Sequence, residues 1–195
     1  AGQPLGDITH VNLNSKCVET VKKQHPGHFV EVIHTDNEFV TSGGNVKSLT
    51  GDYSERIVKI WGFDAEDKLY CKGRFSTGHT KPIDHTLLLN RTSLATLSKD
   101  RRIIITDLIQ EHNISTISTG NEEPLSACQA DYNSLLYGGS GSSLRLVDIR
   151  SRKLIRDKIE LKGELVQLTR MTRFSDHEIM LCNVNQLQLF DLRTL

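Results

Sequence analysis

Short runs in which apolar and polar residues alternate recur along the chain at a nearly fixed interval. Trp61, Thr106, Val147 and Phe190 occupy matching places in four such runs and are 45, 41 and 43 residues apart. Alternation with a period of two is typical of β-strands that bury one face. The four runs are Ile57-Val58-Lys59-Ile60-Trp61, Ile103-Ile104-Ile105-Thr106-Asp107, Leu144-Arg145-Leu146-Val147-Asp148 and Leu187-Gln188-Leu189-Phe190-Asp191.

Further strand-like segments fill the chain between these runs, separated by turn residues such as Asp36-Asn37. Two segments precede each run, and one follows each of the first three. No ten-residue segment has an apolar stripe of helical period, so the pattern predicts an all-β chain. The additional predicted strands are His28–Thr35, Phe39–Gly43, Leu69–Phe75, Ile83–Asn90, Ser93–Ser98, Asn113–Ser118, Leu125–Ala130, Ser134–Tyr137, Leu154–Leu161, Val166–Phe174 and Glu178–Cys182.

A period of roughly 40–45 residues with four strands per repeat is the sequence signature of a β-propeller. Short motifs recur at corresponding places in these repeats. Gly27-His28 and Gly78-His79-Thr80 precede first strands, and Ile60-Trp61 closes a third strand. Val147-Asp148-Ile149 and Phe190-Asp191-Leu192 look like Trp-Asp endings in which the Trp is replaced. On these residues the chain resembles WD40 repeats over about positions 7 to 192.

The resemblance implies a structural role for several polar residues. In WD40 repeats the histidine, a turn aspartate and a serine or threonine form a buried hydrogen-bonded network with the tryptophan. The first repeat can carry this network with His28, Asp36, Thr41 and Trp61, and His79 has the matching place in the second repeat. The network is expected to be partial or missing in the other repeats. The implied function is a non-catalytic scaffold for protein–protein interactions in a multiprotein complex.

The resemblance also implies how the chain is divided. Residues 1–24 are predicted to hold the third and outer strands of an earlier blade, Ile8–Leu13 and Cys17–Lys22. Propellers of this type commonly have seven blades, so we expect the C-terminal portion of a larger propeller, with the remainder in a longer chain or a second fragment. The alternative is a four-bladed ring closed by Cys17–Lys22. The four predicted repeats are residues 25–75, 76–118, 119–161 and 162–192, the last without its outer strand.

Composition narrows the range of partners. Lys plus Arg and Asp plus Glu are 24 each, so the formal charge is zero, whereas nucleic-acid binders usually carry a basic excess. Direct nucleic-acid binding is therefore disfavoured, and a chromatin-associated propeller remains an alternative. The sequence shows no signal peptide and no apolar run long enough for a membrane helix. The four spaced cysteines predict reduced, largely buried thiols in a cytoplasmic or nuclear protein.

Patterns that would indicate catalysis or ligand binding are weak. His25, His28 and His34, or His79 and His85, lack the Cys or carboxylate neighbours typical of zinc sites, so no metal is predicted. Residues 138–143 are glycine-rich, but no helix is predicted after them to complete a phosphate cradle. We interpret this segment as a hairpin turn that uses positive φ values. No cofactor and no enzymatic activity are predicted.

Two consecutive repeats end in Asp-x-Arg, with Asp148 and Arg150 in one and Asp191 and Arg193 in the other. In WD40 substrate receptors of cullin-4 ubiquitin ligases, an arginine at this place contacts the adaptor. A ligase receptor is therefore an alternative function, and local pairing of these arginines with carboxylates is the competing interpretation. The residues that resemble the adaptor-binding box are Leu135, Leu136, Gly138, Gly139, Leu144, Asp148 and Arg150, with Val147 where the family has an aromatic residue.

Overall fold

The polypeptide folds into a series of small antiparallel sheets. A computed structural model describes residues 8–12, 17–21, 29–34, 38–43, 56–141, 143–161, 168–183 and 185–194. A two-stranded hairpin comes first, formed by β1 (Ile8–Asn12) and β2 (Cys17–Val21). The only helix among the described residues is the 3-10 turn η1 (Leu192–Thr194), and no described helix has the length and apolarity to cross a membrane.

Four sheets follow, which we call blades 1 to 4, and in each the neighbouring strands are consecutive and antiparallel. Blade 1 contains β3 (Phe29–His34), β4 (Phe39–Gly43), β5 (Ile57–Phe63) and β6 (Leu69–Ser76). Blade 2 contains β7 (Ile83–Asn90), β8 (Ser93–Ser98), β9 (Arg102–Asp107) and β10 (His112–Ser118). Blade 3 contains β11 (Pro124–Asp131), β12 (Ser134–Gly139), β13 (Ser143–Asp148) and β14 (Lys153–Glu160). Blade 4 contains β15 (Arg170–Arg173), β16 (Glu178–Cys182) and β17 (Leu187–Asp191).

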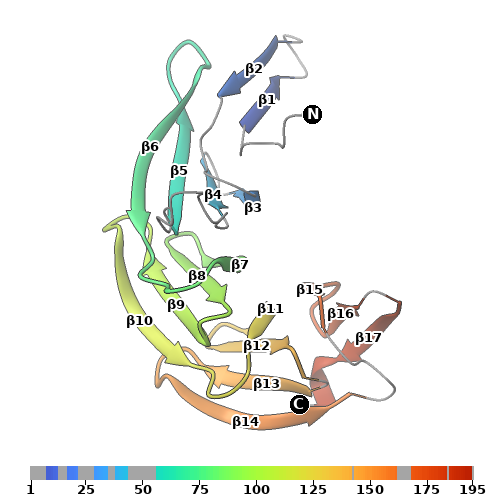
Figure 1. The fold of residues 1–195 in the computed structure, drawn as a ribbon. Coiled ribbons are helices and arrows are strands. Elements are labelled where there is room, and N and C mark those ends of the chain that lie inside the picture. Colours follow the sequence, from blue (N-terminus) through green and yellow to red (C-terminus); the bar gives the residue numbers. More distant parts are fainter. Residues whose placement is uncertain are drawn as a thin grey trace, which may run out of the picture.

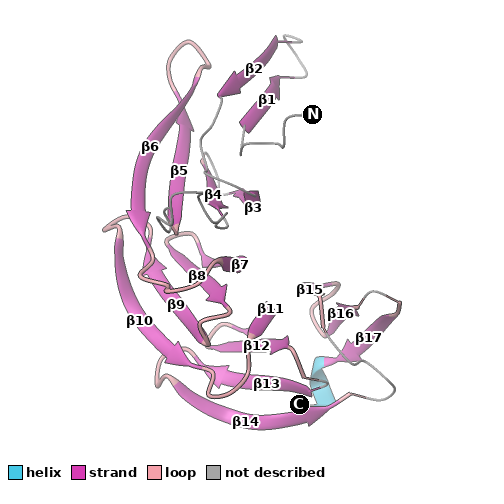
Figure 2. Cartoon of the chain, in the orientation of Figure 1, coloured by secondary structure: helices cyan, strands magenta, loops and turns pink. Residues whose placement is uncertain are grey.

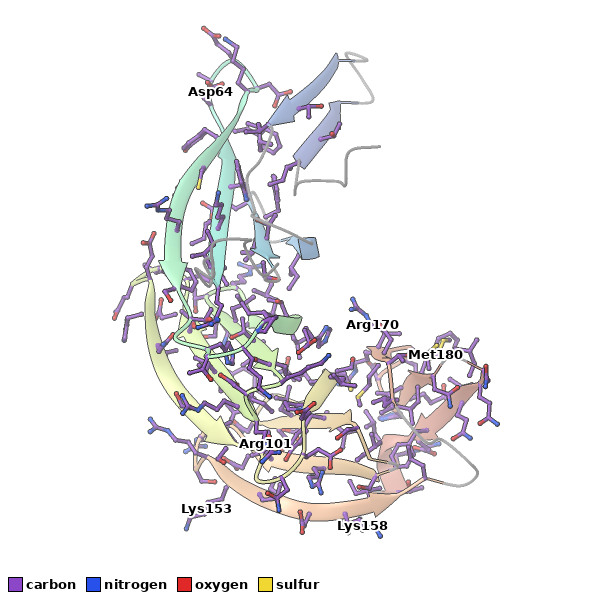
Figure 3. The ribbon with its side chains drawn as sticks, viewed as in Figure 1. Asp64, Arg101, Lys153, Lys158, Arg170 and Met180 are labelled. Carbon is purple, nitrogen blue, oxygen red and sulfur yellow. The ribbon has the colours of Figure 1, made fainter. Side chains whose placement is uncertain are left out.

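The blades follow one another around an arc (Figure 1). The first strands β3, β7, β11 and β15 lie on its concave side, where consecutive ones contact each other. The outer strands β6, β10 and β14 form the convex side (Figure 2), and Lys153 and Lys158 project outward from β14 (Figure 3). This arrangement confirms the predicted all-β propeller architecture.

The positions that define the sequence period are structurally equivalent. Trp61 pairs with Phe39, Thr106 with Leu94, Val147 with Leu135 and Phe190 with Ile179. Each pair joins a residue near the start of a second strand to a residue in the C-terminal half of a third strand. The recurring apolar run is therefore the third strand of each blade, because that central strand buries side chains against neighbouring sheets.

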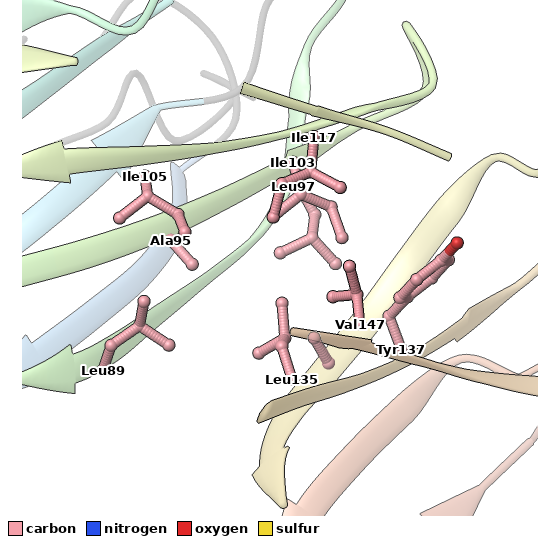
Figure 4. Close-up of a cluster of buried hydrophobic side chains, with 10 residues drawn as sticks. Leu89, Ala95, Leu97, Ile103, Ile105, Ile117, Leu135, Tyr137 and Val147 are labelled. Carbon is pink, nitrogen blue, oxygen red and sulfur yellow. The ribbon is translucent and has the colours of Figure 1, made fainter. Parts of the chain in front are cut away.

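The core is made between blades rather than inside them. One cluster joins blades 2 and 3, and in it Leu97, Ile103, Leu135 and Val147 point toward one another (Figure 4). Leu97, Leu135 and Ile103 are completely inaccessible to solvent. A single sheet cannot cover its own apolar side chains. Each blade therefore buries these side chains against the neighbouring blades.

The glycine-rich segment matches its predicted role only in part, since β12 and β13 pair antiparallel on its two sides as in the predicted hairpin. Gly138 and Gly139 belong to β12 rather than to a turn, and Ser143 begins β13. Positive φ values at glycine occur in the described chain at Gly78 and Gly120, outside this segment. A Cβ at Gly139 would collide with the backbone carbonyl oxygen of Glu123. Close approach of two backbones, and not left-handed geometry, therefore explains a glycine at position 139.

Candidate functional site

Trp61 lies in β5, in the cluster that joins blade 1 to the first hairpin, and is fully buried. Its indole Nε1–H donates to Thr41 Oγ1 at 2.8 Å, and its ring stacks on Phe39 with an interplanar angle of 8°. Both partners come from β4, the strand next to β5. The structure thus brings together Thr41 and Trp61 of the expected network, while His28 and Asp36 lie outside the described residues.

In blade 2 a fuller version of this network surrounds His79, which precedes β7. Its Nδ1 lies 3.1 Å from both carboxylate oxygens of Asp100, and its Nε2 lies 3.0 Å from Thr96 Oγ1. Asp100 comes from the turn between β8 and β9 and also accepts the backbone N–H groups of Thr80 and Arg102. The network therefore joins the β6–β7 connection to the β8–β9 turn through hydrogen bonds.

Burial lowers the pKa of His79 from 6.5, and the charge of Asp100 opposes this effect without cancelling it. In the neutral imidazole, a hydrogen on Nδ1 donates to Asp100, while Nε2 faces the hydroxyl and the carbonyl oxygen of Thr96 at 3.0 and 3.2 Å. Both ring nitrogens are engaged by groups of the protein itself. The geometry suits specification of a turn rather than proton transfer to a substrate.

Thr96 and Asp100 are functional partners that sequence reasoning missed. Asp100 follows the second strand of its repeat, whereas the expected partner in blade 1, Asp36, lies in sequence between the first and second strands. The available signal was the polar turn of Lys99, Asp100 and Arg101 between two strand-like segments. Thr106 occupies the place of Trp61 in this blade and bonds to Asn113 Oδ1 at 3.0 Å.

Blade 3 has a different polar cluster in the corresponding region. Glu122, in the β10–β11 connection, accepts the backbone N–H of Gly141 at 2.8 Å and pairs with Arg145 of β13. The Arg145 Nε–H also reaches Asp157 Oδ1 at 3.1 Å. The sequence offered no repeat motif for this pair, because a Glu–Arg pair replaces the histidine–aspartate pair of blade 2.

The aspartates that end third strands serve as turn caps. Asp148 Oδ1 accepts the Ser151 N–H at 2.6 Å, and Asp191 Oδ1 accepts the Arg193 N–H at 2.9 Å. Asp107 accepts the N–H groups of Ile109 and Gln110 in the same way. Hydrogen bonds to the ionised carboxylate lower the pKa of all three, and the bonds from Arg193 bring the pKa of Asp191 to about 2.

The two candidate arginines differ in their surroundings although both follow third strands and so lie on the same ring face. The Arg193 guanidinium pairs with Asp191, with Nη2 2.7 Å from Oδ2. Arg150 is exposed, and its neighbour Asp148 owes its lowered pKa mainly to the Ser151 N–H, with the charge of Arg150 as the smallest cause. Arg193 therefore forms a local pair, whereas Arg150 lines a groove.

This groove has a volume of about 260 Å³ and opens between blades 2 and 3 on the same ring face. Its walls come from the ends of β7 and β9, the start of β10, and the β11–β12 and β13–β14 turns. Tyr132 and Arg150 stand at its edge, and Tyr132 is 79% exposed. We refer to it as the blade 2–3 groove.

The other histidines that the sequence offered as metal ligands do not lie close together. His79 is part of the turn network, and His85 Nε2 lies 3.0 Å from the carbonyl oxygen of Ala127. His25 and His28 are outside the described residues, and within the described part no three His, Cys, Asp or Glu residues form a group that could hold a metal ion. The expectation of largely buried thiols is wrong for Cys71, which is exposed on β6, because an outer strand has no sheet beyond it. Burial raises the pKa of Cys128 to about 12.

Comparison of the sequence with models of protein families and with curated proteins gives no match. Among solved structures, the chain is similar to the WD40 β-propeller domain of Doa1, with a TM-score of 0.63 and 15% sequence identity. The match covers 87% of this chain and 55% of that chain, so this chain spans about half of its length. At this identity the likeness shows the fold, which is that of a WD40 β-propeller.

Proposed function

We propose that the protein is a non-catalytic scaffold that binds other proteins through the surface of its propeller, within a multiprotein complex. The observation that carries this proposal is the ring face that holds the blade 2–3 groove. Ile109 and Tyr132 are 75% and 79% exposed there, in the turns between strands. Large apolar side chains held in turns on a rigid sheet scaffold favour recognition of a partner surface.

The polar clusters support the same proposal. The ring nitrogens of His79 and the carboxylate of Asp100 bond to each other and to neighbouring turns, and Glu122 bonds to Arg145 and Gly141. Such clusters stabilise the blades, since buried polar groups with partners specify one local geometry. Their role is structural, which leaves the exposed turns for contact with partners.

The test is affinity purification of the full-length protein from cells that express it, followed by quantitative mass spectrometry. We expect a defined set of proteins in near-stoichiometric amounts. The double variant Ile109→Ala, Tyr132→Ala should lose part of that set. The matched control Tyr70→Ala, Lys158→Ala, with both changes on outer strands, should retain it. Elution of the wild-type protein alone, without partners, would contradict the proposal.

The second candidate function is a substrate receptor of a cullin-4 ubiquitin ligase. The favouring observation is that Arg150 and Arg193 follow the third strands of consecutive blades on one ring face. Local pairing of Arg193 with Asp191 weakens it, since this ion pair must open for contact with an adaptor. Pulldown with the cullin-4 adaptor decides, comparing wild type with the Arg150→Ala, Arg193→Ala variant. No recovery by the wild-type protein would exclude this function.

A nucleic-acid- or chromatin-associated propeller is the third candidate. The formal charge of zero provides no excess of cations to neutralise phosphates. Association with chromatin would then proceed through a bound protein, and the purification experiment would identify that protein directly.

A further inference from the structure

The blade 2–3 groove is the open end of the core between these blades. Leu89, Ile105 and Ile149 line it, and the same three residues belong to or pack against the buried inter-blade cluster. The groove therefore has an apolar floor that is continuous with the buried cluster between blades 2 and 3. Such a floor is rigid, and a bound apolar side chain would extend the core rather than rest on a mobile surface.

The rim of the groove carries side chains of the type that dominate protein interfaces. Tyr132 lies in the β11–β12 turn, Ile114 in β10, and both are exposed beside the groove. Arg150 and Arg152 lie in the connection between β13 and β14. Tyrosine and arginine are enriched among residues that carry most of the binding energy at interfaces, especially next to an apolar pocket.

One of the residues that line the groove has a buried hydroxyl group without a hydrogen-bond partner. Ser115 is only 7% exposed, and its Oγ has no hydrogen-bond partner in the described structure. It lines the groove next to a register shift in β10 between Asn113 and Ser115. A buried hydroxyl without a partner costs free energy, and a backbone group of a bound segment would remove that cost.

The charge of the groove selects the chemistry of the partner. Two arginines line it, and none of its described lining residues carries a carboxylate. Arg152 donates one N–H to the carbonyl oxygen of Ile114, which leaves further guanidinium donors for a ligand. The nearest acidic neighbour of Arg150 in sequence, Asp148, is engaged as a turn cap. An anionic group next to an apolar side chain would therefore match the groove.

The volume of the groove limits the size of the group that can bind in it. Pockets that enclose a drug-sized molecule measure roughly 300–1,000 Å³, and this groove, at about 260 Å³, is smaller. It has room for one large apolar side chain and the backbone on either side of it, while the charged flanks of the segment would stay at the rim.

We propose that the blade 2–3 groove binds an extended acidic segment of a partner protein, with one leucine- or phenylalanine-sized side chain on the apolar floor, a backbone group on Ser115 and a carboxylate on Arg150. This proposal rests on the scaffold function proposed above and specifies the chemistry of one partner.

The test uses fluorescence anisotropy of the full chain with fluorescein-labelled nonapeptides. The probe has one central leucine flanked by glutamates, and two matched peptides replace the leucine with serine or the glutamates with lysines. We expect saturable binding of the probe and binding of each matched peptide weaker by about tenfold or more, as loss of a hot-spot contact would give. Equal affinities for all three peptides, tighter binding of the lysine peptide, or no saturation below about 1 mM would overturn the proposal.

Variants of the protein locate the binding. Tyr132→Ala and Arg150→Ala should each weaken binding of the probe by about tenfold. The controls Ile155→Ala and Arg156→Ala remove an exposed apolar side chain and an exposed arginine of β14, outside the groove, and should leave the affinity unchanged. Ser115→Ala should weaken binding while the thermal midpoint stays level or rises, because no hydrogen bond of the free protein is lost. Unchanged binding by Tyr132→Ala and Arg150→Ala would place the peptide elsewhere and overturn the proposal.

The outcome is separable from that of the scaffold function. If no peptide binds while the Tyr132→Ala, Arg150→Ala double variant still co-purifies with every wild-type partner, the groove is excluded and the scaffold function stands. If the wild-type protein co-purifies with no partner, the scaffold function itself fails.

Discussion

At the scale of single residues, an aspartate at the end of a third strand performs the same task in three blades. Asp107, Asp148 and Asp191 each accept backbone N–H groups from the turn that follows. A carboxylate can satisfy these donors where the strand stops and no ladder partner remains. The repeated aspartate is therefore explained by turn formation, and adaptor binding is not required to account for Asp148 or Asp191.

His79 gives the protein a predictable response to pH. Its pKa is lowered in the folded state by burial, so the unfolded chain takes up the proton more readily. The contribution of His79 to stability is present above its ordinary pKa of 6.5 and is lost as pH falls toward the lower folded value. We expect the free energy of unfolding in urea to decrease between about pH 7.5 and 5.5, and to decrease less in His79→Gln.

The control for this experiment is His112→Gln, which changes an exposed histidine of β10 and should keep the wild-type pH dependence. A wild-type protein that gains stability toward pH 5.5, with the gain lost in His79→Gln, would show that the Asp100 charge outweighs burial, and would reverse our assignment of a neutral imidazole.

Trp61 should be among the most sensitive positions in the chain. Its side chain is fully buried, stacks on Phe39 and donates to Thr41. Trp61→Ala should lower the free energy of unfolding by about 3–5 kcal/mol, as large core truncations do. Thr41→Val should lower it by about 1–3 kcal/mol, because the indole N–H would lose its acceptor while remaining buried. Chemical denaturation measures both, and a Trp61→Ala midpoint equal to that of the wild type would contradict the register of β5.

At the scale of elements, the strands were largely predictable. Ile83–Asn90, Ser93–Ser98 and Glu178–Cys182 were predicted with the bounds that the structure has. β16 alternates buried and half-buried side chains, whereas β8 is buried on both faces, so the turn residues that flank these strands marked their bounds as much as alternation did. The polar clusters were less predictable, because Glu122 and Arg145 are far apart in sequence and follow no repeated motif.

Gly139 tests the role of backbone approach inside a blade. Gly139→Ala places a methyl group against the carbonyl of Glu123, and the pairing of β11 with β12 must shift to accommodate it. We expect a loss of about 1–3 kcal/mol in the free energy of unfolding. The matched control is Gly62→Ala in β5, where the new Cβ would meet the Tyr70 side chain at an ordinary 3.5 Å. Equal effects of the two substitutions would argue against a steric requirement at Gly139.

At the scale of the whole molecule, stability depends on the contacts between adjacent blades. Leu135 of blade 3 is fully buried in the cluster shared with blade 2. Leu135→Ala should cost about 2–5 kcal/mol through the cavity it leaves. Hydrogen exchange should accelerate in both blades 2 and 3 and change least in the β1–β2 hairpin, since coupling in repeat architectures is between nearest neighbours. Acceleration confined to blade 3 would show that the blades are stable independently.

The sequence could indicate the propeller but not the blade 2–3 groove, and the reason is physical. A repeated core leaves a repeated pattern of apolar residues, whereas a groove between blades is assembled from single residues of different repeats. Ser115, Tyr132 and Arg150 are separated in sequence and share no motif. Arg150 was predicted as a candidate partner-binding residue from its place after a third strand, and that role stays a prediction.

The last strand has a consequence for how the protein behaves in concentrated solution. Within the described chain β17 pairs with β16 alone, and Leu187 on it is 69% exposed. Where β17 is the edge strand of its sheet, its exposed leucines favour pairing with the same strand of a second molecule, and proteins usually block such edges with charge. Light scattering of the purified chain should therefore rise with concentration, and Leu187→Lys or Leu189→Lys should suppress the rise without altering the melting temperature.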